Sequence, residues 1–265
     1  MYRFLLKPGW LALHVGAALL AVLFIFLGLW QLERMNERQA RNALLAERLG
    51  LEPQPLSNLL SEFRTDLPPA DPASVAYRTA QVRGRYDASE EVLLRTTENY
   101  AGQAGYYLLT PLVLTDGRAL LIERGWVPFD DDEPPISGAT PPPGEVDLSG
   151  TLQLERPPPS GPLAGLAPRD PPGELDITAH IDTARLSEQT PYELLPVYLQ
   201  LREQTPAQES KLPLPLIPPE LTPGPHLGYA IQWFAFTFIG VVGYGFILQR
   251  VVKSRAAAPQ QPREA

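Results

Sequence analysis

Residues 227–248 contain no charged side chain, and this stretch constrains the fold more than any other. At about 1.5 Å of rise per residue, a helix of that length covers roughly 33 Å, enough to cross the hydrocarbon core of a bilayer. Residues 11–30 form a second uncharged stretch. It is longer than the apolar part of a secretory signal and lacks a small-residue cleavage site, so we interpret it as an uncleaved anchor. The sequence thus predicts two transmembrane helices.

Charge is distributed unevenly over the 265 residues. Residues 31–226 hold 29 acidic and 16 basic side chains, whereas the two ends together hold 6 basic and 1 acidic. Because basic residues favour the cytoplasmic side, we expect a two-span protein of the bacterial cell membrane with both termini in the cytoplasm. The acidic middle argues against nucleic acid as a partner and leaves the lipid bilayer as the expected surroundings of the ends.

A period of two in the middle of the chain predicts strands, at 77–86, 91–96, 106–114, 118–127, 145–154 and 192–202, the last one broken at Pro196. Asp116-Gly117 has the composition of a hairpin turn between two of them. Several short antiparallel strands at this spacing favour a small barrel or sandwich. The expected fold is therefore a two-helix transmembrane hairpin bracketing a mainly-β extracytoplasmic domain.

Proline and glycine mark the boundaries between these parts. We divide the chain into a cytoplasmic N-terminus (1–10), the first span (11–30), its helical extension (31–50), a proline-rich connector (51–73), the β-rich domain (74–205), a second connector (206–226), the second span (227–248) and a cytoplasmic tail (249–265). Short helices are expected at 56–63 and 181–189, and proline-rich loops at 128–144 and 156–173.

The densest carboxylate run is Asp130-Asp131-Asp132-Glu133, which could attract a divalent cation. Neighbouring side chains of an extended segment point in opposite directions, and Pro134-Pro135 follows, so we interpret the run as a solvated turn. After Phe129 this segment has almost no apolar content. We therefore expect residues 129–144 to be dispensable for folding.

His226 stands at the start of the second span, where Pro223 and Pro225 suit the first helical turn. The positive end of the helix dipole disfavours imidazolium, which leaves a ring nitrogen free to bind a metal. Tyr229 and Trp233 follow at spacings that place them on the same helical face. The alternative is an interfacial belt in which these side chains only anchor the helix at headgroup depth.

Trp30 and Arg34 lie at the outer end of the first span. An arginine there can hold a ligand carboxylate or a lipid phosphate, or simply extend to the headgroups. We interpret His14 as an interfacial or interhelical hydrogen-bonding residue and His180 as a structural histidine. The chain has no cysteine, so disulfides and thiolate metal sites are excluded, and it carries no motif for acyl or phosphoryl transfer.

Four separated motifs occur along the chain: Gly28-Leu29-Trp30-Gln31-Leu32-Glu33-Arg34, Gly105-Tyr106-Tyr107-Leu108-Leu109-Thr110-Pro111-Leu112, Arg124-Gly125-Trp126-Val127-Pro128, and His226 followed by Tyr229-Ala230 and Gln232-Trp233-Phe234. With the two spans, they resemble the Surfeit locus protein 1 family, assembly factors for haem-copper cytochrome c oxidase. Residues 128–175 depart from the family pattern.

The resemblance implies a chaperone that handles haem a, with oxidase subunit I and other assembly factors as partners. It implies His226 as the ligand of the haem iron, with Tyr229, Trp233, Trp30 and Arg34 as the surrounding residues that we assign to the cofactor site. From their own chemistry, we expect Trp126 to fill the core of the β domain and Arg124 to brace a loop. We expect no enzymatic activity.

Two other classes of function fit the same outline. A stable accessory subunit of a respiratory complex would have no role in haem handling and would co-purify with the mature oxidase. An anchored extracytoplasmic sensor or hydrolase would need a nucleophile and a base, for which the sequence offers little material.

Overall fold

A computed structural model describes residues 3–60, 74–95, 100, 102–159, 165, 168–219 and 221–257. The chain forms two compact units, a helical one made of Met1–Leu44 and Glu220–Ala265 and a β-rich one made of Leu45–Pro219. We describe each unit by itself. The second part of the first expected connector (61–73), the middle of the loop 156–173 and the end of the C-terminal tail lie outside the described residues.

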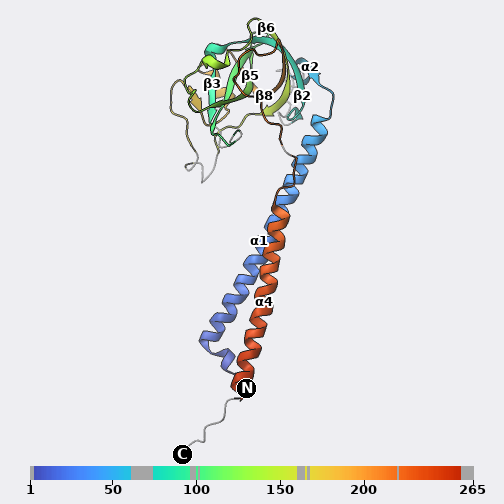
Figure 1. Cartoon of the computed structure of the whole chain (residues 1–265), viewed down its shortest axis with the longest axis vertical. Helices are drawn as coiled ribbons and strands as arrows, with labels where there is room; N and C mark the ends of the chain where they lie inside the picture. Colours follow the sequence, from blue (N-terminus) through green and yellow to red (C-terminus); the bar gives the residue numbers. More distant parts are fainter. Residues whose placement is uncertain are drawn as a thin grey trace, which may run out of the picture. The chain divides into compact units, whose positions relative to one another are not determined.

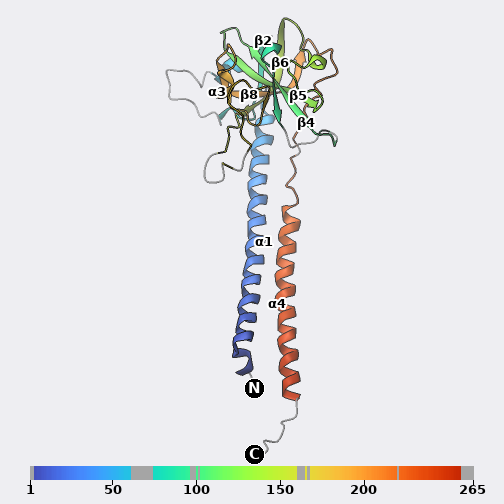
Figure 2. The same cartoon turned by 90° about the vertical axis from the view of Figure 1, so that its left-hand side faces the viewer.

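The helical unit contains a short 3-10 helix, η1 (Arg3–Leu6), and two long helices, α1 (Pro8–Leu49) and α4 (His226–Ala257), which lie side by side (Figures 1 and 2). Both are long and apolar enough to cross a membrane. α1 begins at a proline, which suits the first helical turn, and Gly50 follows its last residue. As expected, α1 continues without a break from the first apolar stretch to residue 49.

The helices approach closely where α1 carries a glycine. A side chain at Gly28 would bring its Cβ to 2.6 Å from the ring of Phe234, so only glycine leaves room for that ring. Ala230, one turn before Phe234, is also buried, with 1% of its surface exposed. Next to this contact, Phe24 of α1 packs against two rings of α4. Its ring centroid lies 5.4 Å from that of Trp233 and 6.0 Å from that of Phe236. Small and aromatic residues therefore define the helix-helix contact.

Among its described residues, the β-rich unit contains an eight-stranded sheet, two short α-helices and two short 3-10 helices. Its strands are β1 (Gln54–Pro55), β2 (Thr79–Tyr86), β3 (Val92–Arg95), β4 (Gly105–Val113), β5 (Ala119–Pro128), β6 (Glu145–Leu154), β7 (Ile177–Thr178) and β8 (Leu194–Thr205). The helices are α2 (Leu56–Leu60), α3 (Thr183–Ser187), η4 (Ala88–Glu90) and η5 (Ser137–Ala139).

The strands follow the order β1-β2-β6-β8-β5-β4-β3-β7, and β2 also pairs with β4. This second pairing, Arg85 with Val113 and Tyr86 with Leu112, joins β2, β6, β8, β5 and β4 in a ring of paired strands. Five predicted strands are confirmed with their ends within two residues, and the turn between 114 and 118 is confirmed as well. The domain is mainly β, as the sequence indicates.

Two details of the predicted sheet are wrong. β5 and β8 are parallel, as are the pairs β1/β2 and β3/β7, so the sheet is mixed and not purely antiparallel. β8 also runs through Pro196 without a break. Its pairing with β5 shifts between Leu194 and Tyr198, and a proline is tolerated at such an irregularity because no ladder hydrogen bond is needed there.

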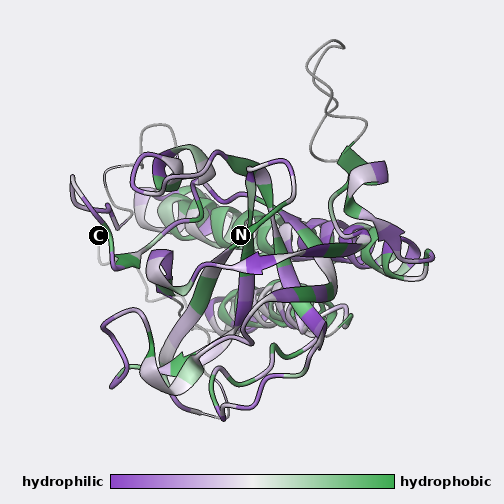
Figure 3. Cartoon of the chain, turned by 90° about the horizontal axis from the view of Figure 1, so that it is seen from above, coloured by the Kyte–Doolittle hydropathy of each residue, from purple (hydrophilic) through white to green (hydrophobic). Residues whose placement is uncertain are grey.

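β5 lies at the centre of the sheet, and every residue from Ala119 to Val127 is buried. Successive side chains of a strand point to opposite faces, so alternate residues enter different clusters. Leu120 and Ile122 belong to the largest cluster, whereas Ala119 and Leu121 pack with residues of α3 and β8. Figure 3 shows hydrophobic (green) and hydrophilic (purple) residues along the strands. The two covered faces explain why this strand is apolar almost throughout.

The loop between β5 and β6 is part of the core, contrary to the expectation that it can be removed. Ile136 and Ala139 are buried, at 4% and 0% exposed, and pack against Leu93, Leu108 and Val127. The carboxylate run at 130–133 is at the surface, as predicted, but the second half of the loop turns inward through η5. Two apolar residues were enough to anchor a segment whose composition is otherwise polar.

Replacing residues 129–144 by a short Gly/Ser linker is therefore expected to unfold the β-rich unit. Deleting one buried aliphatic side chain costs about 2–5 kcal/mol, and each buried polar partner left without a hydrogen bond costs about 1–3 kcal/mol more. Together these approach the stability of a typical domain, about 5–15 kcal/mol. Protease resistance of the purified protein measures the loss.

The matched control replaces only the four acidic residues 130–133 by serine, which leaves Ile136 and Ala139 in place. This variant is expected to stay folded. A linker variant that resists protease as well as the control does would show that the loop contributes nothing to the core.

Candidate functional site

His226 is the first residue of α4, as the two prolines before it predict. The carbonyl of Pro225 accepts a hydrogen bond from the Tyr229 N–H (3.2 Å), which closes the first turn. Gly224 adopts a positive φ of 72°, so the chain turns sharply just before the helix begins. The imidazole is half-buried in this position.

Gln31 of α1 holds the imidazole of His226. The distance from its Oε1 to Nδ1 is 2.9 Å. With the amide oxygen as the acceptor, the ring donates from Nδ1, and in this tautomer of the neutral imidazole Nε2 carries the lone pair. Metal-binding histidines commonly donate their other N–H to an acceptor in this way, which fixes the tautomer and the orientation of the ring.

The residues before α4 are fastened to α1 as well. Arg38 Nε and Asn42 Nδ2 both donate to the carbonyl of Thr222, each at 2.9 Å. A Cβ at Gly224 would lie 3.1 Å from Arg38 Nη1, so this glycine lets the arginine lie across the turn. α1 therefore fixes the start of α4 through one bond to His226 and two to the segment before it.

The residues predicted to surround His226 lie in two groups. Trp233 faces α1, where it packs against Phe24, whereas Tyr229 is 49% exposed. Trp30 is 45% exposed, and Arg34 pairs with Glu37 of its own helix at 2.7 Å. The side of α1 that meets α4 is thus marked by Gln31 and Arg38. Gln31 directly follows Trp30, and Arg38 lies four residues after Arg34.

Sequence reasoning missed Gln31 as a partner of His226. The residue stands inside the motif that ends the first span, directly after Trp30. A polar amide at membrane depth is a signal in itself, because such groups need an interhelical partner. What could not be read from the sequence was the rotation of α1 about its axis, which decides whether Trp30 or Gln31 faces α4.

The donor set at this site is small. Among the described residues no group of three or more His, Cys, Asp or Glu side chains could hold a metal ion. A single neutral imidazole binds a bare ion weakly, but it is a common axial ligand of a metal whose other positions are filled by a macrocycle. The apolar helices below His226 supply a surface on which such a ring could rest.

The other two histidines make hydrogen bonds of the kind that was expected. His14 Nδ1 bonds with the hydroxyl of Tyr244, which joins α1 to α4. His180 Nε2 lies 3.0 Å from the carbonyl of Pro168 in the β-rich unit. Each therefore has a structural partner.

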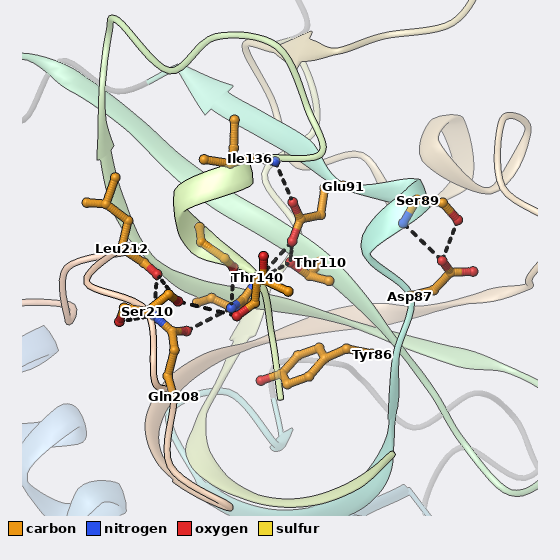
Figure 4. A network of polar contacts seen from close by, with 12 residues as sticks. Tyr86, Asp87, Ser89, Glu91, Thr110, Ile136, Thr140, Gln208, Ser210 and Leu212 are labelled. Atoms are coloured by element: carbon orange, nitrogen blue, oxygen red, sulfur yellow. Dashed lines mark hydrogen bonds and ion pairs between the residues drawn. The ribbon is translucent and has the colours of Figure 1, made fainter. Parts of the chain in front are cut away.

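A second constellation lies in the β-rich unit, where Arg124 and Glu91 form an almost completely buried ion pair (Figure 4). Their side chains are 0% and 1% exposed, and Nη1 lies 2.8 Å from Oε1. The carboxylate also accepts from the Thr110 hydroxyl at 2.8 Å and from the Ile136 N–H at 3.2 Å. The ring of Tyr86 lies under the guanidinium, whose carbon is 5.2 Å from the ring centroid.

Burial raises the pKa of Glu91 and lowers the pKa of Arg124. Both directions mean that removal from water disfavours the charged forms, which the pairing offsets. A buried pair of this kind destabilises strongly when one partner is removed, by about 3–5 kcal/mol. Its geometry serves the fold, because each hydrogen bond ends on a different segment of the unit.

The pair also holds the chain on its way to α4. Arg124 Nη2 donates to the Ala139 carbonyl at 2.8 Å and to Gln208 Oε1 at 2.7 Å. Beyond Gln208, the backbone groups of Leu214 and Trp126 exchange two hydrogen bonds of 2.8 Å. We call residues 208–214 the strap, because they lie across β5. Arg124 thus braces the loop as predicted, and Trp126, 2% exposed, fills the core.

The sequence profile of the SURF1 family matches residues 18–238. The chain belongs to the SURF1 family. An uncharacterized SURF1-like protein of Mycobacterium tuberculosis is 30% identical over 258 residues, which cover 95% of this chain and 88% of the relative. The human Surfeit locus protein 1 is 32% identical over 146 residues, 48% of this chain and 45% of its own length.

The SURF1 match includes both constellations. Gln31, Arg124 and His226 lie inside the matched range, whereas His14 lies before it. The Surfeit locus protein 1 of chicken is 30% identical over 154 residues, 52% of this chain and 47% of the relative. The resemblance noted on four motifs is therefore confirmed at the level of the family.

Gly125 provides a test of the strap in this SURF1 member. Its φ is 152°, and a Cβ there would lie 2.1 Å from the carbonyl oxygen of Leu214. Gly125→Ala must push the strap away and break its bonds to Trp126, which is expected to lower the free energy of unfolding by roughly 2–4 kcal/mol. Thermal unfolding followed by near-ultraviolet circular dichroism measures this change.

Gly138→Ala is the matched control, since its Cβ would meet Leu212 at an ordinary 3.6 Å. We expect the free energy of unfolding of this variant to lie within about 0.5 kcal/mol of the parent value, because the substitution causes no clash. Equal stability of the two variants would show that the strap does not lie against β5.

Proposed function

We propose that this protein is a membrane-anchored assembly factor for haem-copper cytochrome c oxidase that binds haem a and presents it to subunit I. The observation that carries the proposal is the imidazole of His226, held by Gln31 with its Nε2 free, at the start of an apolar helix. Membership of the SURF1 family supports the choice of oxidase assembly over other membrane functions.

In this role the chain would supply one ligand of the haem iron and would fix the orientation of that ligand. Gln31 would hold the His226 ring in one orientation through Nδ1, which leaves Nε2 as the nitrogen that can bind iron. Trp233 and Phe24 offer aromatic surface one to two turns below. Bound haem supplies the iron that His226 would hold, and the transfer itself breaks no covalent bond, which is why we propose a carrier and not an enzyme.

We further propose that α1 and α4 span the bacterial cell membrane, with both termini in the cytoplasm and the β-rich unit outside. The large apolar side chains exposed along both helices support their contact with lipid, and Arg250, Lys253 and Arg255 at the end of α4 favour the cytoplasmic side. In this orientation His226 lies at the outer surface. The proposed partners are subunit I and other oxidase assembly factors.

The decisive variant is His226→Ala. It is expected to reduce the haem that co-purifies from haem-a-producing cells by at least about tenfold, because no other described imidazole stands at this position. The rest of α4 is unchanged, so insertion should be normal. An absorption spectrum, normalised to protein, measures the occupancy.

His180→Ala is the matched control, since it removes an imidazole that has a structural partner in the β-rich unit. This variant should keep the spectrum. An unchanged spectrum in His226→Ala would overturn the proposal. Co-purification of a haem-free protein in equal amounts with mature oxidase would instead support a structural accessory subunit.

Gln31 is expected to act as a positioning residue. Gln31→Leu removes the acceptor of the Nδ1 proton and should lower haem affinity by about 10–100-fold, the usual effect of losing such a partner. Gln31→Glu keeps an acceptor and makes the imidazole more basic, so haem should stay bound with a lower reduction potential. Potentiometric titration followed by absorbance reads both effects.

Gln39→Leu is the matched control, because it makes the same substitution as Gln31→Leu at an exposed position of α1. A reduction potential in Gln31→Glu equal to that of the parent would show that Gln31 does not act through the imidazole.

A further inference from the structure

A cleft of about 510 Å³ lies between α1 and α4, further along the helices than Trp233. Small residues create it, because Ala17 and Ala21 of α1 face Gly240 and Gly243 of α4. Neither glycine has an atom within 4 Å of the place where a Cβ would stand. The cleft therefore has room for a chain of carbon atoms without any change in the backbone.

The wall of the cleft offers almost no polar group to a ligand. Three lining side chains carry oxygen or nitrogen, and each has a partner within the helix pair. Thr237 donates to the carbonyl of Trp233 at 3.1 Å, and His14 bonds with Tyr244. No charged residue lines the cleft. Its occupant should accordingly be uncharged and apolar.

The cleft lies on the side of α4 that carries His226. Residues 226, 230, 233, 237, 240 and 244 recur at spacings of three and four, so they form one stripe along the helix. The bond of His226 to Gln31 and the burial of Ala230 show that this stripe faces α1. From His226 to Phe236, where the cleft begins, the helix rises by roughly 15 Å.

We propose that the cleft holds the isoprenoid side chain of the haem whose iron is bound by His226. This rests on the proposed function, and it explains how haem a would be distinguished from protohaem, which has the same iron and carboxylates but lacks the long chain. A free lipid chain could enter the same space. The haem side chain has the advantage that ligation at His226 tethers it at the head of the same stripe, which raises its effective concentration at the cleft.

The energetic gain comes from packing. Within a membrane, an isoprenoid chain that enters the cleft moves from lipid tails to apolar side chains. Its preference for the cleft therefore depends on close packing and not on removal from water. We therefore expect haem a to bind at least about tenfold more tightly than protohaem, a factor that a few packing contacts can supply. The full chain in lipid nanodiscs, titrated with each haem and followed by absorbance, gives the two affinities.

Gly240→Leu tests the location of the chain. The leucine side chain would occupy the cleft, so haem a affinity should fall to the level of protohaem while protohaem affinity stays unchanged. Gly245→Leu is the matched control, since Gly245 also has open space around it but does not line the cleft. It should leave both affinities as they are.

The outcomes separate this inference from the proposed function. If the parent protein binds both haems and His226→Ala binds neither, but haem a and protohaem bind equally, the cleft proposal is overturned and the proposed function stands. If the parent protein binds neither haem, both fail. Should Gly240→Leu lose both haems, Gly243→Leu decides: loss of haem a alone supports the proposal, and a second loss of both overturns it.

Discussion

The β-rich unit depends on one buried cation. Arg124 has a planar, permanently charged group that is costly to remove from water unless its N–H donors find partners. Both terminal nitrogens find partners, whereas the buried Nε has none among the described residues. Its partners come from four parts of the chain: the carboxylate of Glu91 before β3, the hydroxyl of Thr110 in β4, the carbonyl of Ala139 in the loop after β5, and the amide of Gln208 in the strap. Replacing any one of them leaves a buried donor unpaired, so these segments hold one another in place.

The same constellation explains why the motif Arg-Gly-Trp occurs as a unit. Arg124 fixes the beginning of the strap through Gln208, Gly125 leaves room for the Leu214 carbonyl, and Trp126 pairs its backbone with Leu214. Eleven residues lie between Leu214 and His226. The motif therefore holds the connector on its path toward α4. In the helical unit, Arg38 and Asn42 bind the carbonyl of Thr222 near the end of this connector.

Periodicity predicted most of the elements, because amphipathic strands and long uncharged helices can each be recognised from a short stretch of sequence. Pairing did not follow from it. The parallel neighbours β5 and β8 begin 75 residues apart, and neither strand's sequence indicates which partner it pairs with. The prediction that the loop at 129–144 is dispensable was wrong for a related reason. Its composition is polar, but Ile136 and Ala139 pack against a hydrophobic cluster formed by residues that are distant in the sequence. At the site, His226 could be found from its place at a helix start, whereas Gln31 required the rotation of a second helix.

A carrier must bind its cargo and also release it, and the proposed site is built for both. Multidentate metal sites hold their ions tightly because several ligands must leave together. Here the chain offers one imidazole at the head of α4, so on the proposed function a single bond from this chain would hold the haem iron. Release would then require the loss of that one bond, while packing between α1 and α4 keeps the orientation of the donor unchanged. On the proposed function, Gln31 would orient the single ligand His226, and one ligand alone would bind the haem weakly enough to let it be released.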